Sequence, residues 1–191
     1  MNSAQKLKIL TDSGKTVFSL KNLQSLWGVK NQTAKMVAKR MTDKGLIFRI
    51  SKGYYSLNKD FNNYELANLI ISPSYVSLHS SLFYHGVSFQ ISNIVSSVAF
   101  LSYQKKVKEK FFKYYAMKKS LFFNLEGVNY RGNLSIACPE RAILDSFYFG
   151  LLPNIDNPEN INPTYLREIS FYYPKEVNKK IEQLLRNLSK K

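Results

Sequence analysis

The chain has 191 residues, 45% of them apolar, which is enough to bury a core in one large or two small domains. Its 28 lysines and arginines outnumber 13 aspartates and glutamates, and the resulting net charge of +15 indicates a polyanionic partner. The single cysteine, Cys138, excludes an internal disulfide, and two histidines, His79 and His85, give no Cys/His zinc pattern. We therefore expect no metal site and no other cofactor.

The hydropathy of the chain argues against a membrane protein. No run of eighteen or more apolar residues occurs, and the first residues, MNSAQKLKIL, lack the apolar segment of a secretory signal. The sequence therefore predicts a cytoplasmic protein with no membrane contact.

The positive charge is unevenly distributed along the chain. Residues 1 to 60 hold 12 basic and 3 acidic side chains, and residues 61 to 104 hold no lysine or arginine. Residues 105 to 119 then hold 7 lysines and one glutamate. The N-terminal third and this short central segment are therefore the candidate regions for binding a polyanion.

Two short helices are predicted in the N-terminal third. Ser19 is a suitable N-cap and Gly28 a left-handed C-cap for the first, while Asn31 as N-cap and Gly45 bound the second. The apolar positions of the second helix lie on one face: Ala34, Val37, Ala38 and Met41. The opposite face carries Gln32, Thr33, Lys35, Met36, Lys39 and Arg40. This pattern is typical of a helix-turn-helix whose second helix enters the major groove of DNA.

A basic and aromatic ribbon follows directly, at residues 45 to 58, GLIFRISKGYYSLN. Its two arms meet at a tight turn that Gly53 permits, so it is suited to be the wing of a winged helix. Arg49, Lys52 and a tyrosine, Tyr54 or Tyr55, would contact phosphate or the minor groove. The alternative is an ordinary hairpin with solvated charges. The predicted DNA-binding residues are Gln32, Thr33, Lys35, Lys39, Arg40, Arg49, Lys52 and Tyr54.

The remaining sequence predicts an α+β fold. The expected elements are helices around residues 64 to 71 and 75 to 85, a strand at 94 to 101, strands at 111 to 117 and 128 to 137, and a helix opened by Pro139. A last helix follows Pro174, with an apolar stripe at Val177, Ile181, Leu184, Leu185 and Leu188. We expect a winged helix-turn-helix domain at residues 1 to 60 and, at residues 61 to 191, a mixed α/β domain with a small antiparallel sheet.

The central lysine segment has several interpretations. Lysines recur with period two at 106, 108 and 110, as on the outer face of a strand. The segment could be a solvated strand face, a docking surface for an acidic protein, or a second nucleic-acid contact through Lys105, Lys106, Lys108 and Lys110. Because phenylalanine and tyrosine alternate with the lysines, a platform for single-stranded nucleic acid or RNA is a further alternative.

Catalysis has little support in the sequence. Ser81 and His85 lie four residues apart on a predicted helix, but no third partner of a nucleophile and base is evident. Cys138 is expected to behave as a small buried apolar residue. Glu140, Arg141 and Asp145 are expected to form a structural cap and an ion pair, or part of a partner-binding face. We therefore expect a protein that is not an enzyme.

Three segments, in this order and spacing, carry a family resemblance: GLIFRISKGYYSL, SPSYVSLHSSLFYHGV and ACPERAILDSFYF. Residues 5 to 150 resemble the abortive-infection type IV antitoxin family of transcription regulators. The resemblance implies an N-terminal winged helix that represses its own toxin–antitoxin operon by binding the operator as double-stranded DNA. It also implies a C-terminal antitoxin domain and a nucleotidyltransferase-like toxin encoded nearby. The alternatives are an interaction protein that neutralises a toxin directly, and an RNA-binding module.

Overall fold

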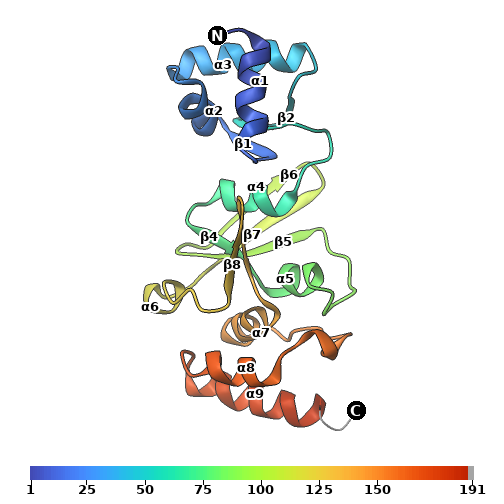
Figure 1. The fold of residues 1–191 in the computed structure, drawn as a ribbon. Coiled ribbons are helices and arrows are strands. Elements are labelled where there is room, and N and C mark those ends of the chain that lie inside the picture. Colours follow the sequence, from blue (N-terminus) through green and yellow to red (C-terminus); the bar gives the residue numbers. More distant parts are fainter. Residues whose placement is uncertain (189–191) are drawn as a thin grey trace. The chain divides into compact units, whose positions relative to one another are not determined.

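The computed structural model describes residues 1 to 188 and has an α+β fold (Figure 1). The chain divides into two compact units, Met1–Ile70 and Ile71 onward, which are described separately below. Among the described residues, no helix is long and apolar enough to span a membrane.

The first unit combines helices with a small antiparallel sheet. Its elements are α1 (Ser3–Asp12), β1 (Val17–Ser19), α2 (Leu20–Trp27), α3 (Asn31–Asp43), β2 (Phe48–Ser51), β3 (Tyr54–Ser56) and α4 (Asn63–Ile70). The strands lie in the order β1-β3-β2. Leu10, Phe18, Leu23 and Met41 are fully buried together in the core of this unit.

Local sequence signals explain how α2 and α3 begin and end. The Ser19 side chain accepts a hydrogen bond from the Asn22 backbone amide, and the Asn22 side-chain oxygen accepts one from the Ser19 backbone amide. Gly28 ends α2 in the left-handed conformation with φ 62°. Both caps of α2 are as predicted. The predicted N-cap of α3 is wrong by one residue, because Asn31 is already helical and Lys30 occupies the cap without a side-chain hydrogen bond.

The second unit contains a six-stranded mixed sheet in the order β6-β7-β5-β4-β9-β8. Its strands are β4 (Ser74–Val76), β5 (Ile94–Ala99), β6 (Tyr103–Val107), β7 (Lys110–Ala116), β8 (Val128–Arg131) and β9 (Leu134–Ala137). Two pairings, β4 with β9 and β5 with β7, are parallel. The sheet of this region is therefore larger than predicted and is mixed where an antiparallel sheet was expected, because strand order depends on non-local pairing.

Helices pack around this sheet and against one another. They are α5 (Leu78–Tyr84), α6 (Lys119–Phe122), α7 (Pro139–Tyr148), η1 (Pro158–Asn160), α8 (Pro163–Ser170) and α9 (Lys175–Leu188). Pro139 is the first residue of α7, as predicted. Val177, Ile181 and Leu185 of the predicted α9 stripe are buried in the core with Leu184 partly buried, while the side chain of Leu188 lies outside the described residues.

Two other predictions for this unit need correction. Residues 74 to 76 form β4, so the helix predicted at 75 to 85 begins only at Leu78; the short apolar run SYVSL fits either structure. The lysine period of two also does not follow one strand. Lys108, with φ 52°, lies in the turn between β6 and β7, so Lys106 and Lys110 are on opposite arms of a hairpin.

Candidate nucleic-acid interface

Helix α3 has one buried face and one exposed, basic face. Ala34, Ala38 and Met41 are at most 1% exposed and pack in the core of the first unit. This is the inner face that the apolar spacing predicts. Four of the residues predicted to bind DNA are exposed on the other face: Gln32, Lys35, Lys39 and Arg40. Thr33 is half-buried at the edge of that face.

The β2–β3 hairpin presents two further cations. Arg49 pairs with Tyr55 across the strands, and the register shifts between Arg49 and Ser51, so the ladder is irregular close to the turn. Gly53 has φ 85°, a conformation that glycine adopts without strain, and this tight turn leaves Lys52 exposed at its tip. Buried Ile50 and Tyr55 anchor the hairpin while Arg49 and Lys52 stay in solvent.

A groove of about 600 Å³ lies between α3 and the hairpin. It is lined by Leu20, Lys35, Lys39, Thr42, Asp43, Arg49, Lys52, Gly53 and Tyr55. Four of the eight residues predicted to bind DNA therefore line one groove, two from each element. We call Lys35, Lys39, Arg49 and Lys52 the basic groove. Asp43 is the acidic side chain among the lining residues, so positive charge dominates there.

The other four predicted residues do not line this groove: Gln32, Thr33, Arg40 and Tyr54. α-Helix geometry explains the position of Arg40, which lies about 140° around the helix axis from Lys35. Arg40 therefore lies to one side of the residues of α3 that line the groove. Tyr54 is half-buried in β3 next to the turn.

Sequence reasoning missed two lining residues on α3, Thr42 and Asp43. Both lie within one helical turn of Lys39, so the helical period could have placed them on the groove side. The position of the hairpin relative to α3, which creates the groove, has no such local signal.

The central lysines lie on the β6–β7 hairpin of the second unit, with β6 at the edge of the sheet. The Lys110 ammonium donates to the Ser92 carbonyl at 2.9 Å, and Lys106 Nζ lies 5.4 Å from the centre of the Phe111 ring. Lys106 and Lys108 are exposed, and Lys105 is half-buried. Lysines on an edge strand also hinder unwanted pairing with other strands, which favours the solvated-face interpretation.

The side chains considered for catalysis make structural contacts. The Ser81 hydroxyl donates to the Ala137 carbonyl at 2.6 Å, and His85 Nε2 lies 3.0 Å from the same oxygen. Both side chains thus tie α5 to β9. Cys138 is the buried N-cap of α7, and burial raises the pKa of its thiol to about 12. Within residues 1 to 188, no cluster of three or more His, Cys, Asp or Glu residues could hold a metal ion.

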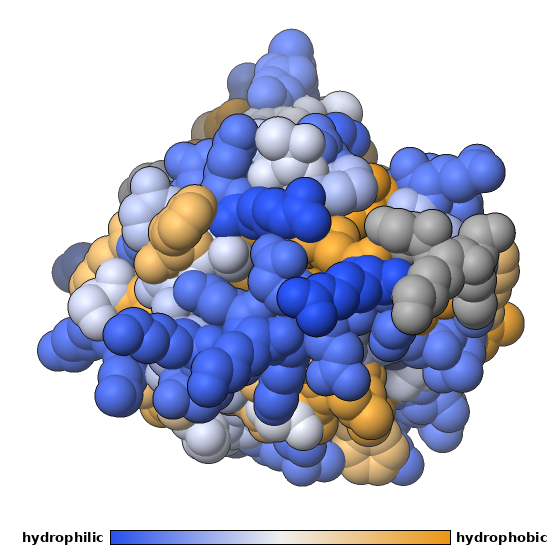
Figure 2. All heavy atoms as spheres, turned by 90° about the horizontal axis from the view of Figure 1, so that it is seen from below, coloured by the Kyte–Doolittle hydropathy of each residue, from blue (hydrophilic) through white to orange (hydrophobic). Residues whose placement is uncertain are grey.

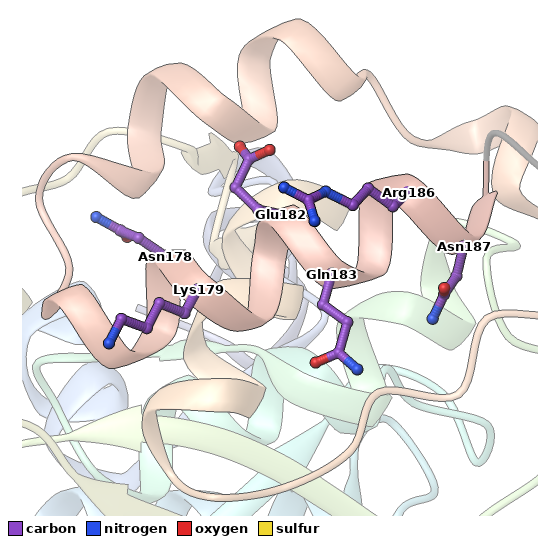
Figure 3. A pocket seen from close by; sticks show the side chains of 6 residues that line it. All are labelled: Asn178, Lys179, Glu182, Gln183, Arg186 and Asn187. Carbon is purple, nitrogen blue, oxygen red and sulfur yellow. The ribbon is translucent and has the colours of Figure 1, made fainter.

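The α8–α9 end of the second unit is largely hydrophilic, with apolar side chains between the polar ones (Figure 2). A hollow of about 630 Å³ beside α9 is lined by Asn178, Lys179, Glu182, Gln183, Arg186 and Asn187 (Figure 3). Glu182 already pairs with Arg167 of α8, at 3.3 Å between Oε1 and Nε. Because these described lining residues all come from one helix, the hollow is a shallow surface and does not form a candidate site.

No protein-family model matches the chain, and no curated protein matches it.

Proposed function

We propose that residues 1 to 70 form a winged helix that binds double-stranded DNA. In this proposal α3 is the recognition helix and the β2–β3 hairpin is the wing. The order α1, β1, α2, α3, β2, β3, with β3 in the centre of the sheet, supports it. So does the exposed basic face of α3, because a helix of this kind fits the major groove.

The observation that carries the proposal is the basic groove. Lys35 and Lys39 project from the helix, and Arg49 and Lys52 project from the hairpin, into the same space. Four cations gathered in one groove repel one another in the free protein, and a polyanion removes this repulsion. Each phosphate that they neutralise releases counterions, which drives binding.

We further propose that the bound DNA is the operator of the protein's own operon, which would make the chain a transcriptional repressor. The resemblance to abortive-infection type IV antitoxins supports this assignment. It also supports a role as the antitoxin to a nucleotidyltransferase-like toxin encoded nearby, in a cytoplasmic, non-enzymatic protein.

The test is binding of the full chain to a labelled duplex from its own upstream region and to a random duplex of equal length. We expect the double variant Lys39→Glu, Lys52→Glu to lose about 30-fold or more in affinity for both duplexes. The matched control is Lys175→Glu, Lys179→Glu, which changes the net charge equally at exposed positions of α9. We expect this control to stay within about threefold of wild type. Equal losses in the two double variants would refute the basic groove as the binding site.

A further inference from the structure

The second unit exposes a group of large apolar side chains on two loops and at the start of β5. One loop follows α5 and the other follows α7. The exposed fractions are 64% for Phe89, 85% for Ile91, 41% for Ile94, 38% for Leu151 and 89% for Leu152. We call these five residues the apolar patch. Single exposed apolar residues are ordinary, but a group of them is typical of an interaction surface.

The two loops are fixed to each other. The backbone amides of Asp156 and Asn157 donate to the Val87 carbonyl at 2.9 and 3.0 Å. The Phe89 amide donates to the Asp156 carboxylate at 2.7 Å. The Asn154 amide group donates to the Ser88 hydroxyl at 3.2 Å. The patch is therefore part of a hydrogen-bonded surface.

A hollow of about 320 Å³ lies within this surface. Ile94, Leu151 and Leu152 of the patch line it, together with buried Leu78 and Leu82 of α5. The other lining residues are His79, Gln90, Ser92, Ser96, Tyr115, Ser146, Pro153 and Asn154. The Leu152 side chain projects beside this hollow. The surface therefore has both a protruding apolar side chain and a recess.

The charge around the patch differs from that of the rest of the chain. Residues 66 to 104 contain no aspartate, glutamate, lysine or arginine, although the whole chain has a net charge of +15. One cation and one anion mark the ends of the loop that carries Phe89 and Ile91. Lys110 donates to the Ser92 carbonyl at one end, and exposed Asp156 accepts from the Phe89 amide at the other.

We propose that the apolar patch binds a second copy of this chain through a two-fold symmetric contact. Two copies of a protein with a net charge of +15 repel each other over most of their surface, and the uncharged patch avoids this repulsion. A two-fold axis through the patch places the Lys110 end of one copy against the Asp156 end of the other. The surface is thus complementary to itself in charge. This dimer does not depend on the proposed DNA binding.

The test is sedimentation velocity of the full chain from about 1 to 200 µM, without DNA. We expect a monomer–dimer equilibrium in the wild type. Ile91→Asp and Leu152→Asp should each raise the dissociation constant about tenfold or more, because each buries a charge at the centre of the contact. Asp156→Asn retains a side-chain oxygen that can accept from the Phe89 amide. This variant should raise the dissociation constant by only about threefold. The dissociation constant of the variant should also change less with salt concentration than that of the wild type.

The matched control is Phe171→Asp, which places the same charge at another exposed apolar position, 81% exposed and outside the patch. Circular dichroism and thermal unfolding serve to check that each variant folds. We expect Phe171→Asp to dimerise like the wild type. A wild-type chain that stays monomeric throughout this range would overturn the proposal, and so would a dimer that Ile91→Asp and Leu152→Asp leave unchanged.

Discussion

Arg141 and Asp145 form a fully buried ion pair one turn apart on α7, with 3.3 Å between Nε and Oδ1. The Arg141 Nη groups donate to three backbone carbonyls, those of Leu121, Asn124 and Glu126, at 2.8 to 3.1 Å. Arg141 Nη2 also lies 3.1 Å from the Tyr75 hydroxyl. The guanidinium therefore connects α7 to β4 and to the segment around α6.

The Asp145 carboxylate accepts hydrogen bonds from two hydroxyl groups, in addition to its ion pair with Arg141. Tyr173 and Ser77 donate to its two carboxylate oxygens, each at 2.6 Å. Burial raises the pKa of Tyr75 and Tyr173 well above the ordinary value of tyrosine, so both phenols keep their protons. The ion pair expected in this helix thus lies inside the core and holds the second unit together.

The first prediction concerns this pair. Arg141→Met should lower the free energy of unfolding by about 3 to 5 kcal/mol, because Asp145 would remain buried without its cation and three carbonyls would lose a donor. The control is Arg167→Gln in the pair with Glu182, whose side chains are 55% and 50% exposed. That change should cost less than about 1 kcal/mol. Chemical denaturation of both variants provides the comparison, and similar losses would contradict a structural role for the buried pair.

The second prediction compares two left-handed glycines. A Cβ at Gly127, φ 75°, would lie 3.0 Å from Arg141 Cβ and 3.0 Å from Cys138 Sγ, whereas at Gly132, φ 60°, nothing lies within 4 Å. Both alanine variants incur the left-handed backbone cost of about 1 to 2 kcal/mol. Gly127→Ala should lose about 1 to 3 kcal/mol more, through overpacking. Equal unfolding midpoints for the two variants would show that α7 can shift to make room.

Local signals in the sequence predicted part of the fold. The caps of α2, the buried face of α3 and the start of α7 at Pro139 depend on residues that are neighbours along the chain. Helix α1 was missed, although Asn2 and Gln5 form a capping box. Its hydrophobic pattern is weak, and it is held by long-range contacts such as the hydrogen bond from Trp27 to the Lys6 carbonyl.

The features that were not predicted depend on long-range contacts. β4 pairs with β5 and with β9, and no residue within β4 identifies those partners. The same distinction between local signals and long-range contacts applies to the candidate interface. The sequence predicted the exposed cations of α3 and the hairpin, but not that Lys35 and Lys39 would share a groove with Arg49 and Lys52.

The third prediction concerns pH. Burial lowers the pKa of His85, with the nearby Arg131 acting in the same direction and the hydrogen bond to the Ala137 carbonyl opposing it. The unfolded chain therefore binds this proton more readily than the folded chain. The contribution of His85 to stability is complete above about pH 6.5 and is lost as the pH falls from there through the folded-state pKa.

Because other groups also titrate, the measurement is a difference between two proteins. We expect the unfolding free energy of the wild type to fall more between about pH 7.5 and pH 5.5 than that of His85→Gln. Glutamine keeps an amide group that can donate to the Ala137 carbonyl but does not titrate. Parallel pH profiles for the two proteins would refute a lowered pKa at His85.

The last prediction separates base recognition from phosphate contact, and it rests on the proposed DNA binding. Gln32 and Arg40 are exposed on α3 outside the basic groove and can each make two hydrogen bonds to a purine, whereas Lys52 lies at the tip of the hairpin. Arg40→Ala should therefore cost about 1 to 3 kcal/mol on the operator and little on random DNA, which lowers selectivity. Lys52→Ala should weaken binding to both duplexes alike and reduce the slope of log K against log salt by about 1. Fluorescence anisotropy at several salt concentrations measures both quantities. If Arg40→Ala weakened binding to both duplexes equally, Arg40 would be a phosphate contact, and base reading would have to come from the groove side of α3.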